Sequence, residues 1–195
     1  MKNKMCHLSF RKLFFEITSK YAESTSDIDK VYTNVIKKYS SKGRYYHGIN
    51  HIYKMCDLWV EHKDKIVNPD VVFFSIVFHD IIYKPRRSDN EEKSASYFFS
   101  TAIDYFHYMH YETILRIRKF IAQTKHGGIQ SSYEGGLRND LFLFLDFDLS
   151  VLSSSEGEYN QYAKDIRKEY RIYPNFMYRP GRIKVLNSYG KLLQS

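Results

Sequence analysis

The chain has 195 residues, of which 43% are apolar and 27% charged, and its formal net charge is +8. This composition excludes a disordered or fibrous chain and predicts a single globular domain, residues 1–195, with a substantial core. The Lys and Arg residues are scattered, with no block of five or more. The positive charge therefore favours good solubility over a nucleic-acid partner, which is kept as the less favoured alternative.

The sequence indicates a cytoplasmic protein. It has only two cysteines, Cys6 and Cys56, too few for a disulfide framework or a cysteine-based zinc site. Residues 1–21 are basic, but charges interrupt them before a signal-like apolar core develops. No run approaches the roughly 18 apolar residues that a membrane span needs, so we expect no membrane association. The sequence does not predict an oligomeric state.

Apolar residues recur mostly at spacings of three and four, and the chain has only 4 Pro and 9 Gly. This pattern predicts an all-α fold, a helical bundle of about seven to eight helices. In chain order, the predicted helices span residues 9–23, 25–43, 47–62, 70–83, 90–106, 111–126, 137–152 and 156–173. Residues 84–90 and 127–136 are predicted loops.

Two histidines, His47 and His51, stand four residues apart in a segment of aromatic and aliphatic side chains. On a helix, such positions share a face, with Cβ atoms about 5–6 Å apart, so both histidines can serve one site. This spacing alone is weak evidence, because a hydrogen-bonded core histidine is more common than a ligand.

A second ionisable pair, His79 and Asp80, lies in a strongly apolar run. A buried imidazole or carboxylate costs free energy unless a metal ion or internal hydrogen bonds compensate it. Adjacent helical residues point about 100° apart. Both can therefore reach one ion only where the helix meets it obliquely.

The last acidic pair, Asp146 and Asp148, lies in another apolar helix. Positions two apart face different ways, so we expect only one of the two in the same site, and the spacing does not say which. One histidine, the His-Asp pair and one distant aspartate give two nitrogen and two oxygen donors. That set suits a divalent metal ion such as Mn²⁺, Fe²⁺, Mg²⁺, Ni²⁺ or Zn²⁺ and excludes soft-metal sites.

The order of these motifs resembles the HD superfamily of metal-dependent phosphohydrolases, and most closely its small predicted phosphohydrolases. The matching stretches are RYYHGINHI, FHDIIY, DNEEKSA and DFDLSVL, and the later YNQYAKDIRKEY and GRIKVL are also similar. The resemblance covers about residues 44–186. It implies a single HD domain with a divalent metal ion as cofactor.

YHGINH is also similar to a metal-site segment of the cyclic-nucleotide phosphodiesterases, which share the HD core. In those enzymes the second histidine binds metal and the first donates a proton to the leaving oxygen. The resemblance thus implies His51, His79, Asp80 and Asp148 as ligands, with Asp148 chosen because Leu-Ser follows it. His47 is the implied general acid, with a purely supporting role as the alternative. Gly48 departs from the usual asparagine.

Further candidates are less specific. Glu91, preferred to Glu92, is a candidate for positioning the metal-bound water or the substrate, although carboxylates are also favoured at a helix start. His126 is a candidate extra ligand or substrate contact, or an ordinary histidine at a helix end. The candidate substrate contacts lie in loops or at a helix start, where basic residues are often only solvated: Arg44, Lys84, Arg86, Arg87 and Asn90.

These features predict a metal-dependent hydrolase that acts on a phosphate ester in a nucleotide or another small phosphorylated molecule. One alternative is a non-catalytic HD module that binds a nucleotide or a partner and uses the metal structurally. A third, less favoured interpretation is an HD-type di-iron oxygenase, which requires more histidine ligands, with His126 the only ready candidate.

Overall fold

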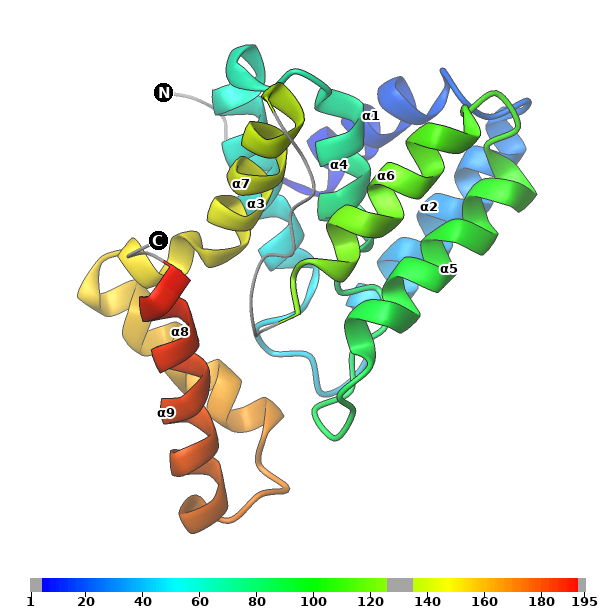
Figure 1. Cartoon of the computed structure of the whole chain (residues 1–195). Helices are drawn as coiled ribbons and strands as arrows, with labels where there is room; N and C mark the ends of the chain where they lie inside the picture. Colours follow the sequence, from blue (N-terminus) through cyan, green and yellow to red (C-terminus); the bar gives the residue numbers. More distant parts are fainter. Residues whose placement is uncertain (1–4, 126–134, 193–195) are drawn as a thin grey trace.

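The computed structural model describes residues 5–125 and 135–192. The predicted all-helical fold is confirmed: these two ranges contain nine α-helices and two short 3₁₀ helices, and neither contains a β-strand (Figure 1). In chain order the elements are α1 (His7–Thr18), α2 (Thr25–Tyr39), α3 (Ile49–His62), η1 (Lys63–Lys65), α4 (Pro69–Phe78), α5 (Asn90–Tyr105), α6 (Tyr111–Ala122), α7 (Gly136–Leu149), η2 (Ser150–Ser153), α8 (Glu156–Glu169) and α9 (Asn175–Leu192).

Helix α4 forms the centre of the bundle. Every residue from Val71 to Phe78 is buried, and α4 contacts α3, α5, α6 and α7. Pro69 occupies its first turn, where the missing N–H costs no helical hydrogen bond. A helix that is apolar on all sides must be surrounded by other elements. The four neighbours therefore pack around α4, which ends directly before the His-Asp pair.

A buried carboxylate fixes α7 against the start of α4. Asp140 of α7 is fully buried and accepts the backbone N–H groups of Val67 at 2.8 Å and Asn68 at 2.7 Å. These donors precede α4, where a helix start leaves N–H groups without intrahelical partners. The bonds hold α7, which carries Asp148, in a fixed position relative to α4.

Two helices differ from their predicted ranges at the candidate site. Helix α3 begins at Ile49 with Gly48 as its N-cap, so His47 precedes the helix. The prediction that His47 and His51 share one face of a helix is therefore wrong. Helix α4 ends at Phe78 instead of Tyr83. The helical hydrogen-bond pattern ends there because the Ile81 N–H donates to the Phe78 carbonyl at 3.3 Å and the Ile82 N–H donates to the Ser94 hydroxyl oxygen at 3.1 Å.

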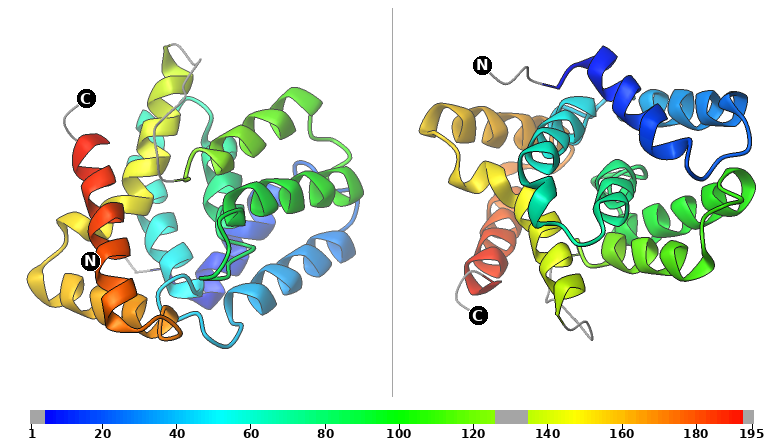
Figure 2. Two further views of the ribbon diagram at one scale, coloured as in Figure 1. Left: turned by 60° about the horizontal axis from the view of Figure 1, so that its bottom comes forward. Right: turned by 90° about the horizontal axis from the view of Figure 1, so that it is seen from above.

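The C-terminal pair, α8 and α9, stands at one side of the bundle, apart from α1, α2, α5 and α6 (Figures 1 and 2). No predicted helix covers α9. Its Pro180-Gly181 dipeptide is a pattern typical of turns, yet the helix runs through Pro180. Tyr162 and Ile166 form the buried stripe of α8.

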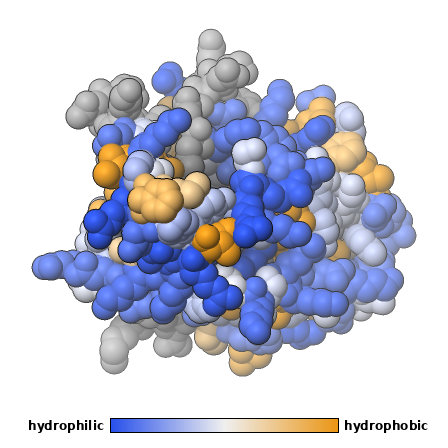
Figure 3. Space-filling model, turned by 90° about the horizontal axis from the view of Figure 1, so that it is seen from below, coloured by the Kyte–Doolittle hydropathy of each residue, from blue (hydrophilic) through white to orange (hydrophobic). Residues whose placement is uncertain are grey.

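None of the described helices is long and apolar enough to cross a membrane. On the face of the molecule shown in Figure 3, hydrophilic residues predominate and hydrophobic ones are scattered among them. Single exposed hydrophobic residues are normal on a protein surface.

Candidate metal centre and its pocket

Three helices bring a cluster of imidazoles and carboxylates together. His51 comes from the first turn of α3, His79 and Asp80 directly follow α4, and Asp148 comes from the last turn of α7. One donor atom from each of His51, His79 and Asp80 lies within 4.8 Å of the other two. Both histidines are buried. The cluster is therefore a candidate site for a cation.

The separations within the cluster fit a shared ion. The Nε2 atoms of His51 and His79 are 3.3 Å apart, and His79 Nε2 is 3.3 Å from Asp80 Oδ2. Asp148 Oδ1 lies 3.0 Å from His51 Nε2 and 3.5 Å from His79 Nε2. Two donors that each lie about 2.0–2.1 Å from one tetrahedral ion are about 3.3 Å apart. Hence His51, His79 and Asp80 can bind one ion with little rearrangement, and Asp148 lies beside both histidines.

The tautomer of His79 also suits a ligand. Its Nδ1 lies 2.9 Å from the carbonyl oxygen of Ile76. A carbonyl only accepts, so Nδ1 carries a proton, and in the neutral form of the ring, which is the form that binds a cation, Nε2 presents a lone pair to the cluster. Such a backbone bond commonly fixes the orientation of metal-binding histidines.

Arg44 shapes the turn that carries Asp80. Its guanidinium donates to the carbonyl oxygens of Asp80 at 2.6 Å, Ile81 at 3.0 Å and His47 at 3.1 Å. These bonds satisfy carbonyl groups of the turn after α4, and they join that turn to the loop before α3. Asp80 lies in this turn, beyond the end of α4, which allows it to reach the same site as His79.

The histidines of the cluster lower the pKa values of its two aspartates. Burial raises the pKa of Asp148, but His79 and His51 lower it more, so it lies well below its ordinary value. Burial likewise raises the pKa of Asp80, whereas His79 and His47 bring it below the ordinary value. Burial lowers the pKa of His51. Both carboxylates are therefore ionised at neutral pH, the form in which they bind a cation.

A buried glutamate holds His47 beside the cluster. Oε1 of Glu169 accepts the backbone N–H groups of Tyr45, Tyr46 and His47 at 2.7, 2.8 and 3.0 Å. Oε2 of Glu169 lies 2.6 Å from His47 Nδ1 and accepts the Tyr83 hydroxyl at 2.7 Å. The imidazole is also stacked on the Tyr83 ring, with centroids 4.2 Å apart. The loop before α3 is thus held by the last residue of α8.

The Glu169 bond fixes the protonation of His47. Burial raises the pKa of Glu169, but the bonds from His47 and Tyr83 bring it below its ordinary value, so the carboxylate is ionised. Burial lowers the pKa of His47, but Asp80 and Glu169 raise it more, and the result is a raised pKa. The Nδ1–H donates to Glu169, which leaves Nε2 as the nitrogen for contact with a ligand.

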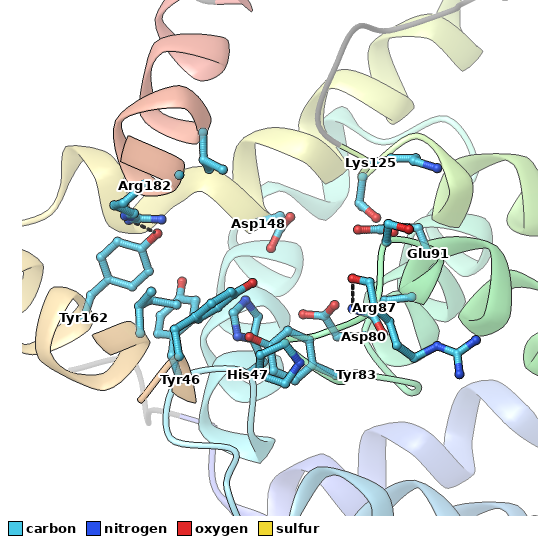
Figure 4. Close-up of a pocket in the computed structure, with 18 of the residues that line it drawn as sticks. Tyr46, His47, Asp80, Tyr83, Arg87, Glu91, Lys125, Asp148, Tyr162 and Arg182 are labelled. Carbon is cyan, nitrogen blue, oxygen red and sulfur yellow. Dashed lines mark hydrogen bonds between the residues drawn. The ribbon is translucent and has the colours of Figure 1, made fainter. Parts of the chain in front are cut away.

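The cluster opens into a pocket of about 500 Å³. His47, His79, Asp80 and Asp148 line it, whereas His51 is buried behind them. Figure 4 shows both aspartates directed into the pocket, with Glu91 and Lys125 on one side and Arg182 and Tyr162 on the other. The opposite wall comes from η2, α8 and α9. A small molecule can therefore lie against the cluster.

Several candidates from the sequence also line the pocket. They are Glu91, Arg87 and Asn90. Burial, together with Asp80, raises the pKa of Glu91. Arg87 is paired with Asp89, and Asn90 closes the loop before α5 through both backbone groups of Lys84.

Other candidates lie elsewhere. Arg44 binds backbone carbonyl groups and is not part of the pocket lining, so its geometry gives it a structural role instead of the predicted phosphate contact. Lys84 and Arg86 are exposed outside the lining. Asp146 is exposed on α7, and His126 lies outside the described residues.

The residues of the pocket region that were not predicted from the sequence include Glu169, which binds His47, and Arg182, which enters the pocket from α9. A signal for Glu169 exists in α8. Tyr162, Ile166 and Glu169 recur at spacings of four and three and are all buried, so an acidic residue occupies the apolar face. A carboxylate at such a position is costly unless a buried partner binds it. No comparable signal marks Arg182.

Comparisons of the chain with protein-family models, with curated proteins and with solved structures give no match.

Proposed function

We propose that the protein is a metal-dependent phosphohydrolase that cleaves a phosphate ester in a nucleotide or another small phosphorylated molecule. The observation that carries this proposal is the position of His47. Its imidazole, held through Nδ1 by Glu169, lines the same pocket as Asp80 and Asp148. A cation site and an oriented proton donor thus share one cavity, which supports hydrolysis over passive metal binding.

His51, His79, Asp80 and Asp148 would hold the divalent ion. An ion there lowers the pKa of water and neutralises charge on a phosphoryl oxygen. The resemblance to the HD phosphohydrolases supports the same assignment. The donor set does not select among Mn²⁺, Fe²⁺, Mg²⁺, Ni²⁺ and Zn²⁺.

His47 would protonate the departing oxygen through Nε2. Glu169 fixes the ring by its bond to Nδ1 and stabilises the charged imidazole, so that the proton is available at one nitrogen only. Three cationic side chains that line the pocket, Arg87, Lys125 and Arg182, would offset the charge of a bound phosphate. Glu91 lies in the same lining and is a second candidate for handling a proton.

The test is a hydrolysis panel on protein loaded separately with each of the five divalent metals. The panel contains p-nitrophenyl phosphate, bis-p-nitrophenyl phosphate, and nucleoside monophosphates and cyclic phosphates. We expect metal-dependent turnover of at least one of these compounds, and loss of that turnover in Asp80→Ala, which also controls for a contaminating phosphatase. No turnover by any metal form, together with thermal stabilisation by nucleotides, would support the non-catalytic binding module instead.

A further inference from the structure

The pocket has two walls of different charge. Among the described residues that line it, the acidic side chains are Asp80, Glu91 and Asp148, and all three belong to the cluster side. The wall formed by η2, α8 and α9 contributes tyrosine, aliphatic and methionine side chains together with Arg182, and no acidic residue. This far wall suits a ligand group that is itself negatively charged.

Arg182 is oriented by an aromatic residue of the neighbouring helix. Its Nη2 donates to the Tyr162 hydroxyl at 2.6 Å, and the guanidinium carbon lies 5.0 Å from the centroid of the Tyr162 ring. The bond and the cation–π contact together fix the position of the charge. A guanidinium held in this way is well suited to bind phosphate oxygens.

A row of rings connects Arg182 with the cluster of imidazoles and carboxylates. Tyr162 packs edge-on against Tyr46, with centroids 4.5 Å apart, and Tyr46 packs against the His51 ring at 4.9 Å. In Figure 4, Tyr46 lies between Tyr162 and His47. The distance from the cluster to Arg182 is thus bridged by aromatic surface, on which a planar ring or a sugar can lie.

The C-terminal segment strengthens the positive charge of this wall. Residues 170–195 contain five Lys and Arg residues and no Asp or Glu, which is more than half of the formal charge of +8. The other charges of α9 include Arg179 and Lys184, both exposed. Their field attracts anions toward the side of the pocket that Arg182 lines.

On the basis of the function proposed above, we propose that Arg182 and Tyr162 form an anion subsite for a second phosphate group of the substrate. The scissile phosphate lies at the cluster, the middle of the molecule lies on Tyr46, and the second phosphate binds the guanidinium. The second phosphate belongs either to a nucleoside bisphosphate or to the next phosphodiester of a single strand. Both sources offer the same oxygen atoms to Arg182.

The test compares the binding of two ligands by calorimetry on Mn²⁺-loaded protein at constant ionic strength, with free phosphate assayed in the same samples. The ligands are thymidine 5′-monophosphate and thymidine 3′,5′-bisphosphate. We expect the bisphosphate to bind about tenfold or more tightly, as one charge-assisted contact allows. Arg182→Met should remove this preference. Arg179→Met, which loses the same charge from an exposed position of the same helix, should keep it.

Two further variants control for the possibility that Arg182→Met changes the fold of α9. Tyr162→Phe should reduce the preference, because it removes the hydroxyl that orients the guanidinium, and Arg182→Lys should retain part of it. A short single-stranded oligonucleotide distinguishes the sources: tighter Arg182-dependent binding than that of the bisphosphate identifies a strand, and equal binding identifies a small substrate.

The proposal is overturned if the wild-type protein binds both ligands equally, or if Arg179→Met and Arg182→Met lose the preference to the same extent. The second result would mean that net charge alone attracts the second phosphate. Binding and hydrolysis are measured separately in these samples. Arg182-dependent binding by a protein that hydrolyses none of the compounds in the panel above therefore contradicts the proposed hydrolysis but supports the subsite.

Discussion

Glu169 binds His47 across 122 residues of sequence, with its Oε2 atom 2.6 Å from the imidazole Nδ1. The same carboxylate accepts three consecutive backbone N–H groups of the loop that carries the histidine. The side chain and the backbone around His47 are therefore positioned by one buried group. This arrangement makes α8 part of the candidate site, although α8 contributes none of the four candidate metal ligands.

Replacing His47 by Ala should separate metal binding from chemistry. The candidate ligands are His51, His79, Asp80 and Asp148, so metal affinity should be unchanged. Turnover should fall by about 10²–10⁴-fold, as expected for the loss of a general acid. Chelator competition measures the first quantity and steady-state kinetics the second. Loss of the metal in this variant would show that His47, and not only His51, is a ligand.

Replacing Glu169 by Gln should lower kcat by about 10–100-fold and leave KM and metal content close to wild type. The amide keeps the shape of the side chain but no longer supplies the negative charge that stabilises a protonated His47. Glu158→Gln is the matched control, because Glu158 is exposed near the other end of α8. Equal effects of the two substitutions on kcat would contradict the orienting role.

The same pair predicts a pH dependence of stability in metal-free protein. Burial raises the pKa of Glu169, but the hydrogen bonds from His47 and Tyr83 bring this pKa below the ordinary 4.5. The contribution of Glu169 to stability is therefore present above pH 4.5 and lost as the pH falls through the lowered pKa. Burial lowers the pKa of His47, but Asp80 and Glu169 raise it above the ordinary 6.5. The contribution of His47 to stability is present below pH 6.5 and lost as the pH rises through the raised pKa.

The difference in unfolding free energy between wild type and Glu169→Gln should therefore be largest between pH 4.5 and 6.5. Urea denaturation from pH 4 to pH 9, with EDTA present, measures this difference. A difference that does not change with pH would mean that Glu169 acts through its backbone bonds alone.

The sequence predicts which residues form the cluster better than it predicts their geometry. The apolar run before His79 predicts a buried helix, and α4 is one. After Phe78, the Ile82 N–H donates to the Ser94 hydroxyl oxygen and Arg44 binds the carbonyl groups of the turn, and both partners lie in other segments. Local periodicity carries no information about such a distant contact.

The C-terminal third shows the same limit. Helix α8 follows its apolar spacing, but the partner of Glu169 is the loop before α3, which no pattern within α8 specifies. Helix α9 contains Pro180, which removes one backbone donor and usually ends a helix. Its position in the fold therefore could not be predicted from propensity.

Replacing Arg44 by Lys should destabilise the protein by about 1–3 kcal/mol, because one ammonium group cannot satisfy three carbonyl groups in different directions. The metal affinity should also fall, because the turn that carries Asp80 loses its anchor. Urea denaturation and metal titration measure the two effects. Arg86→Lys is the control, since Arg86 is exposed and outside the pocket lining. An Arg44→Lys variant with unchanged stability and unchanged metal affinity would contradict the structural role of Arg44.

The two aspartates of α7 provide the most closely matched test of the metal site. Asp148 lies 3.0 Å from His51 Nε2, whereas Asp146, two residues earlier on the same helix, is exposed. Replacement of either by Asn keeps the size of the side chain and removes one charge, so the two variants differ only in position. A rotation of about 200° between the positions directs only one of them into the cluster.

Asp148→Asn should therefore lower metal affinity by at least about tenfold and abolish metal-dependent turnover. Asp146→Asn should change metal affinity little and stability by less than about 0.5 kcal/mol, as for other exposed substitutions. Isothermal titration with Mn²⁺ and Zn²⁺ measures the affinities, and circular dichroism confirms the helical fold of both variants. Equal losses would indicate that both carboxylates contribute to a larger, two-ion site. A greater loss in Asp146→Asn would show that α7 presents its other face to the metal, and the assignment of Asp148 would be wrong.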